Sequence, residues 1–273
     1  MTTPRMSSMT RNFPRRKRRN SMQSAPIGVL DSGMGGLSVL HALRRAMPHE
    51  RFLYYGDNAN APYGPRPPEE IRALTARTAS ALMERGVKAL VIACNTANSA
   101  AGDMLRRQLP IPVVGVEPDL ADAHERAGGK RVIVFATQAT LALPLYRDMR
   151  QRCCPDAVSI PAPELVMMVE RGVLSGEGPE AFFREKLRPW PADELGAVVL
   201  GCTHFIFLRP VLSSIIPGVP VFDGVEPVIE DLRATLSRAD ALAHSGAGGV
   251  ELLSSSDEPG IRARMRVLLA AEL

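Results

Sequence analysis

The chain has 273 residues, of which 45% are hydrophobic and 23% charged, so its composition is that of an ordinary globular protein. Its apolar runs are too short for a membrane-spanning helix, which needs about 20 residues, and its four cysteines show no metal-ligand spacing. We therefore expect a cytoplasmic protein with free thiols, without a membrane segment or a metal.

The formal net charge of +4 originates in the N-terminal segment. Residues 1–25 contain seven arginines and lysines and no acid, whereas the rest of the chain has 26 basic and 29 acidic residues. The segment lacks the apolar region of a secretion signal, so we interpret it as a disordered basic extension. An alternative reading is a weak electrostatic arm, which is the only contact with nucleic acid that the sequence suggests.

Short apolar runs alternate with helical patterns along the rest of the chain. Helices are expected at 35–47, where apolar side chains recur at helical spacing, and at 68–86, which begins with proline and two acids and ends on glycine. The other runs are continuously apolar, as in a parallel sheet covered on both faces. Strands are expected at residues 27–30, 51–56, 89–93, 113–116, 132–135, 197–201 and 219–224.

Three segments recur in the same order at nearly the same offset. IGVLDS at 27–32 matches 132–137, ALVIACNT at 89–96 matches 197–204, and GVEP at 115–118 returns at 224–227. An ordered set of this kind indicates an internal repeat. We therefore predict an α/β fold of two similar parallel-sheet domains related by pseudo-symmetry, with an active site in the cleft between them.

The glycine-rich stretch DSGMGGLS at 31–38 partly matches a dinucleotide-binding fingerprint, with Asp57 as an acid further along the chain. The third glycine is missing, and Asp31 would repel a pyrophosphate. We favour a strand-to-helix turn whose glycines supply special backbone angles, which leaves Asp31 and Ser32 to face a small ligand. A nucleotide-dependent enzyme is the weaker alternative.

Cys94 and Cys202 each follow an apolar strand and precede polar residues, where a core strand would continue apolar. Taken singly, each could be a small buried hydrophobe. As equivalent positions of two halves, they suggest one chemical task performed twice. Inverting a stereocentre by proton transfer requires a base on one face and an acid on the other, and these roles exchange in the reverse reaction. A matched pair of thiols meets that requirement.

The successive motifs resemble those of the glutamate racemases, in the aspartate/glutamate racemase superfamily. DSGMGGLSVL, YYGDNANAPYGPRPPEE, VIACNTANSA, VVGVEP and VLGCTHFIFL follow one another from residue 27 to about residue 227. The resemblance implies cofactor-independent interconversion of L- and D-glutamate, which supplies D-glutamate for peptidoglycan synthesis. It also implies two α/β domains, which we place at 26–114 plus 223–273 and at 115–222, and it leaves a homodimer open.

The resemblance further implies roles for individual residues. Cys94 and Cys202 would be the two acid–base groups, assisted by Asp31 and His204 respectively, and Glu170 would be a carboxylate near the second thiol. The substrate-binding positions would be Asp31, Ser32, Pro62, Tyr63, Gly64, Asn95, Thr96, Thr137, Thr140, Thr203 and His204.

The chain departs from the family pattern at three places. Phe205-Ile206 replaces a usual Tyr-Pro, Gly224-Val225 follows Asp223 where Ser-Gly is usual, and Ala136 replaces a usual glycine. None is a proposed proton-transfer residue, so the departures bear on substrate detail and helix docking. Two alternatives remain, namely an aspartate or broad-specificity amino-acid racemase and a nucleic-acid-binding or regulatory protein that uses the basic arm.

Overall fold

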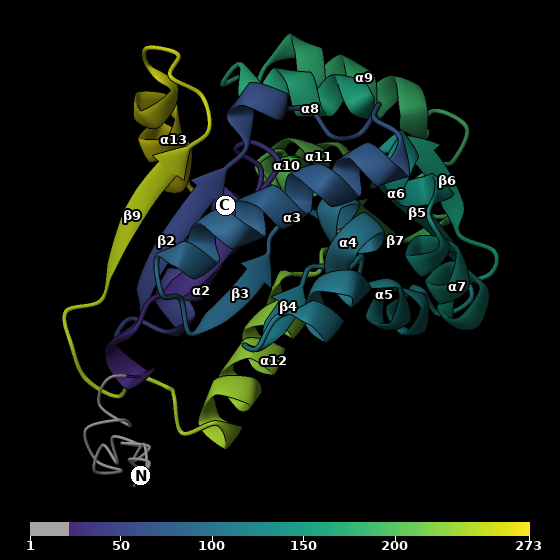
Figure 1. Ribbon diagram of the computed structural model, residues 1–273. Helices are drawn as coiled ribbons and strands as arrows, with labels where there is room; N and C mark the ends of the chain where they lie inside the picture. The colour runs from purple at the N-terminus through teal and green to yellow at the C-terminus, as the bar shows by residue number, and fades with distance from the viewer. Residues whose placement is uncertain (1–21) are drawn as a thin grey trace, which may run out of the picture.

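The computed structural model describes residues 22–273, so most of the predicted basic extension, residues 1–21, lies outside the described residues. Two parallel sheets organise the described part (Figure 1). The first sheet has the strand order β4-β3-β1-β2-β9, and the second has the order β6-β5-β7-β8. All strand pairings in both sheets are parallel, as the continuous apolar runs predicted.

The strands of the first sheet are β1 (Ile27–Asp31), β2 (Arg51–Gly56), β3 (Ala89–Ile92), β4 (Val113–Gly115) and β9 (Gly249–Ser254). Those of the second are β5 (Arg131–Ala136), β6 (Val158–Pro161), β7 (Leu195–Gly201) and β8 (Val221–Phe222). The central strands β1, β3 and β7 are buried along their whole length, which explains their unbroken apolar sequence.

The two sheets repeat one topology. If β1 is matched to β5, β3 to β7 and β4 to β8, the strand orders coincide, and β2 corresponds to β6. The registers agree as well, because Ile27 pairs with Ala89 in the first sheet as Val132 pairs with Ala197 in the second. The predicted α/β class with two similar parallel-sheet halves is therefore confirmed.

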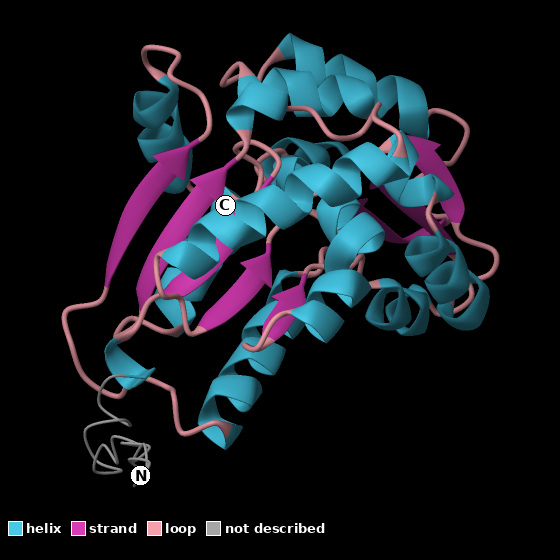
Figure 2. Cartoon of the chain, in the orientation of Figure 1, coloured by secondary structure: helices cyan, strands magenta, loops and turns pink. Residues whose placement is uncertain are grey.

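Helices cover both sides of the sheets (Figure 2). The helices that pack with the first sheet are α2 (Leu37–Ala46), α3 (Pro68–Glu84), α4 (Asn95–Gln108), α12 (Val225–Arg238) and α13 (Ile261–Leu269). Those of the second half are α5 (Leu120–Ala127), α6 (Gln138–Ala142), α7 (Pro144–Cys153), α8 (Pro163–Glu170), α9 (Glu177–Leu187), α10 (Thr203–Ile206) and α11 (Arg209–Ile215). The first sheet and its helices are thus built from segments that precede and segments that follow the second half in the sequence. The domain boundaries given above stay a prediction.

Each central strand passes directly into a helix at its carboxyl end. Cys94 lies between β3 and α4, and Cys202 lies between β7 and α10. Both residues have the extended backbone of a helix N-cap, with φ and ψ of −137° and 117° for Cys94 and −148° and 132° for Cys202. The repeat therefore delivers the two thiols in the same local conformation. No helix within residues 22–273 combines the length and the apolar character needed to cross a bilayer.

Candidate active site

A cavity of about 270 Å³ receives side chains from both halves of the chain, and both Cys94 and Cys202 line it. Its walls include the residues that follow β1, β3, β5 and β7, as expected at the carboxyl ends of parallel strands. The predicted site residues that line the cavity are Ser32, Pro62, Tyr63, Gly64, Cys94, Thr96, Thr137, Cys202 and His204.

Cys94 is buried, with an exposed fraction of 6%. Its Sγ lies 3.4 Å from Ser32 Oγ and accepts a hydrogen bond from the backbone N–H of Ala97 at 3.4 Å. Burial and, to a lesser extent, the charge of Asp31 raise the pKa of the thiol, the contacts with Ser32 and Ala97 lower it, and the balance of these effects is a pKa of about 12. Cys94 is therefore a protonated thiol at neutral pH.

Asp31 lies behind the cavity lining at the end of β1 and is only 1% exposed. Its Oδ2 accepts hydrogen bonds from Gly33 N at 2.9 Å and from the Tyr54 hydroxyl at 3.2 Å. Burial raises the pKa of Asp31, and the nearby His204 lowers it. The backbone N–H groups of Gly33 and Gly36 also lower the pKa of this carboxyl.

Cys202 begins a chain of three polar side chains. Its Sγ lies 3.7 Å from His204 Nδ1, and His204 Nε2 lies 2.7 Å from Glu170 Oε1. Burial lowers the pKa of His204, but Cys202 and Glu170 outweigh burial and hold this pKa well above its usual value. Burial raises the pKa of Glu170, and the hydrogen bond from His204 reverses the shift and lowers it. The arrangement fits a protonated His204 imidazole that the Glu170 carboxylate holds beside the Cys202 sulfur.

The glycines of the DSGMGG turn make room for this chain. A Cβ at Gly33 would collide with Glu170 Oε1, and a Cβ at Gly35 would lie 2.6 Å from Cε1 of His204. Neither glycine has a positive φ. The prediction that these glycines serve special backbone angles is therefore wrong, because what the positions need is the absence of a side chain against the second half of the chain.

Three threonine hydroxyls form a closed triangle across the two halves. Thr96 Oγ1 of α4 lies 2.8 Å from Thr137 Oγ1 and 3.1 Å from Thr140 Oγ1, and Thr137 donates to Thr140 at 2.9 Å. Thr96 and Thr137 line the cavity, whereas Thr140 lies behind them. Hydroxyls that already face one another can rotate to donate to a carboxylate, which fits the predicted substrate contacts.

The remaining predicted residues surround the cavity without lining it. Asn95 is 4% exposed, and neither atom of its amide has a hydrogen-bond partner among the described residues. Thr203 is buried, and its backbone oxygen accepts from Ser38 Oγ at 3.0 Å. Glu170 Oε1 contacts His204 Nε2 at 2.7 Å and also accepts a hydrogen bond from Met34 N at 2.9 Å. Within residues 22–273, no three His, Cys, Asp or Glu side chains are grouped as a metal site would require.

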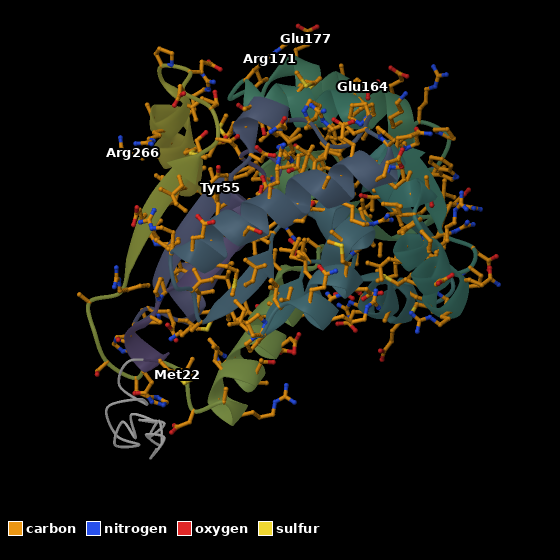
Figure 3. All side chains as sticks on the ribbon, viewed as in Figure 1. Met22, Tyr55, Glu164, Arg171, Glu177 and Arg266 are labelled. Carbon is orange, nitrogen blue, oxygen red and sulfur yellow. The ribbon has the colours of Figure 1, made fainter. Side chains whose placement is uncertain are left out.

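Helix α8 supplies a wall that the sequence did not reveal. Its residues Pro163, Val166 and Met167 line the cavity, while Figure 3 shows Glu164 and Arg171 at the outer edge of the molecule. Pro65 and Gln138 also line the cavity and were not predicted, although each adjoins a predicted residue. An apolar side chain that faces a cavity carries no sequence signal that separates it from a core residue.

The chain resembles known racemases over most of its length. The family model for Asp/Glu/Hydantoin racemase matches residues 27–232. The glutamate racemase of Clostridium acetobutylicum is 39% identical over 239 residues, which cover 86% of this chain and 93% of that protein.

Solved structures give the same result. The glutamate racemase of Thermus thermophilus in complex with β-chloro-D-alanine superposes with a TM-score of 0.78 at 37% identity, covering 91% of this chain and 94% of the other. The enzyme of Francisella tularensis in complex with D-glutamate gives a TM-score of 0.79 at 28% identity, covering 92% and 95%.

Proposed function

The chain belongs to the Asp/Glu/Hydantoin racemase family, and from this premise we propose that it interconverts L- and D-glutamate by proton transfer between Cα and two cysteines, Cys94 and Cys202. The reaction uses no cofactor and supplies D-glutamate for peptidoglycan synthesis in the cytoplasm. The observation that carries the proposal is that two thiols at equivalent strand ends of an internal repeat line one small cavity.

The two thiols have complementary roles in this mechanism. Cys202, whose sulfur lies 3.7 Å from His204 Nδ1, is the base, and Cys94, which burial keeps protonated, is the acid. The Cys202 thiolate takes the proton from one face of Cα, and the Cys94 thiol donates a proton to the opposite face. The charge then resides on Cys94, and the free enzyme is ready for the other enantiomer.

Abstraction of the Cα proton requires stabilisation of a carbanion-like transition state. The hydroxyls of Ser32, Thr96 and Thr137 are donors on the cavity wall that can hold the α-carboxylate as charge spreads into it. The N-terminus of α4, which Cys94 caps, adds a favourable potential for an anion. Since these donors are fixed and largely buried, they lose little energy to solvent reorganisation during the reaction.

The proposal is tested by replacing each thiol separately. Cys94→Ala and Cys202→Ala should both abolish racemisation of L-glutamate and of D-glutamate, measured by circular dichroism, while the far-ultraviolet spectrum stays that of the wild type. Cys153→Ala is the matched control, because Cys153 is a free cysteine at the end of α7 and does not line the cavity. Full activity of either cavity variant would contradict the proposal.

The substrate is the finer part of the proposal. Racemisation of L-aspartate at a kcat/KM equal to that of L-glutamate would instead favour the broad-specificity alternative. A homodimer stays a prediction, which the sedimentation coefficient of the purified protein would test. A role for the basic arm in nucleic-acid binding also stays a prediction, to be tested by removing residues 1–25 and measuring salt-sensitive DNA binding.

A further inference from the structure

Asp57 is the acid downstream of the glycine-rich stretch in the sequence. It lies immediately after β2 and is 4% exposed. Burial of a carboxylate costs free energy unless hydrogen bonds from the protein replace those from water. Asp57 is therefore a residue whose surroundings need an explanation, and the mechanism above does not use it.

Both carboxylate oxygens of Asp57 are occupied by the segment that follows it. Oδ2 accepts a hydrogen bond from the Tyr63 hydroxyl at 2.7 Å, and Oδ1 accepts one from Asn60 Nδ2 at 2.8 Å. The backbone N–H of Asp57 donates to Asp31 O at 2.9 Å. One residue thus connects the end of β1, where Asp31 lies, with the segment 60–65.

That segment forms one wall of the cavity. Residues 62–65 all line it, and the Tyr63 side chain is 2% exposed in the same apolar cluster as Cys94. Burial and then the bond to Asp57 raise the pKa of Tyr63, so its hydroxyl remains protonated and acts as a donor. The ring is fixed at one end by Asp57 and packs with the cluster that contains the first thiol.

A second support holds the segment from its exposed side. Arg66 Nε donates to Asn60 O at 3.0 Å and to Pro62 O at 3.3 Å, and its guanidinium forms an ion pair with Glu70. This outer support holds backbone oxygens. The inner support, through Asp57, holds the side chain of Tyr63.

We propose that Asp57 is a positioning residue for the reaction, which sets the 62–65 wall against Cys94 by holding Tyr63 and Asn60. The proposal rests on the proposed function for its effect on turnover. The effect of Asp57 on how far the 62–65 wall shields Cys94 from solvent reagents does not depend on the substrate. The two effects are measured separately.

The test compares Asp57→Ala, Asp57→Asn and Tyr63→Phe with the wild type. Asp57→Ala should lower kcat/KM for glutamate about tenfold or more, because the wall loses its inner support. Asp57→Asn should recover most of the loss, since its amide oxygen can accept from Tyr63 while Asn60 flips its own amide. Tyr63→Phe is isosteric and should reproduce part of the loss. The double variant Asp57→Ala/Tyr63→Phe should have a kcat/KM little lower than that of Asp57→Ala, because both changes break the same hydrogen bond between Tyr63 and Asp57.

A second readout is independent of activity. The rate at which iodoacetamide alkylates Cys94, followed by mass spectrometry of its peptide, should rise about tenfold in Asp57→Ala, while Cys154, which is 2% exposed outside the cavity, should react at its wild-type rate. Glu251→Gln is the matched control for loss of a carboxylate, because Glu251 lies on β9 in an exposed ion pair with Arg85.

The outcomes separate the two proposals. If Asp57→Ala and Tyr63→Phe lower only the melting temperature, and leave both kcat/KM and Cys94 labelling at wild-type values, the positioning role is wrong. If the wild-type protein does not racemise glutamate but Cys94 labelling rises in Asp57→Ala, the positioning role holds and the proposed function fails.

Discussion

Gly35 is a position at which one added methyl group should cost much of the activity. A Cβ there would lie 2.6 Å from Cε1 and 2.7 Å from Cγ of His204, and closer still to Nδ1, whereas ordinary van der Waals contact begins at 3.4 Å. The imidazole would have to retreat by roughly 1 Å from a buried place where Glu170 holds it. A displacement of about 1 Å in an active site can cost on the order of 100-fold in rate.

We therefore expect Gly35→Ala to lower kcat/KM for glutamate about 100-fold in a circular dichroism assay. Overpacking should also cost about 1–3 kcal/mol of stability in a urea titration, which leaves a folded protein to assay. Gly178→Ala on α9 is the matched control, since the nearest atom lies 3.8 Å from its Cβ and its activity should not change. Wild-type kcat/KM in Gly35→Ala would show that the position of His204 is not critical.

Two further predictions concern the free energy of unfolding. Lys88 and Glu50 form an ion pair at 2.7 Å with side chains 2% and 1% exposed, so Lys88→Met should lower the free energy of unfolding by about 3–5 kcal/mol in urea. The kcat/KM of this variant should not change, because the pair lies at the amino ends of β2 and β3, opposite the cavity; wild-type stability would contradict the prediction. The lowered pKa of Glu170 means that its carboxylate stabilises the fold above its usual pKa of 4.5, and that this stability is lost as the pH falls through the lowered value. The difference in unfolding free energy between wild type and Glu170→Gln should therefore shrink as the pH falls below 4.5, and a constant difference would contradict the shift.

The central strands could be predicted from the sequence because they are buried on both faces. The two strands that were missed, β6 and β9, are at sheet edges, where burial is partial and the apolar signal is diluted. The VSIP sequence of β6 contains a serine and a proline, and GVELLS of β9 has a charged residue at its centre. Their pairing depends on the neighbouring strand, β5 or β2, which no local pattern encodes.

The candidate site was partly visible for a similar reason. Cys94 and Cys202 stood out because each lies between an apolar strand and polar residues, and because they occupy equivalent positions in the two halves of the repeat. The cavity wall of α8 and the supporting bond from Tyr54 to Asp31 depend on tertiary packing. The role of the glycines was misread, since a close approach between segments over a hundred residues apart looks in sequence like a turn requirement.

The most direct measurement is the isotope at Cα after one turnover in deuterated water. Two thiols on opposite faces require that the product receive its hydrogen from the solvent-exchanged thiol that did not remove the substrate proton. Ordinary L-glutamate should therefore give D-glutamate that carries deuterium at Cα, while unreacted L-glutamate keeps protium, as read by mass spectrometry after chiral separation. First-turnover D-glutamate that retains the original protium would mean that one group removes and returns the proton, and would contradict the two-cysteine mechanism.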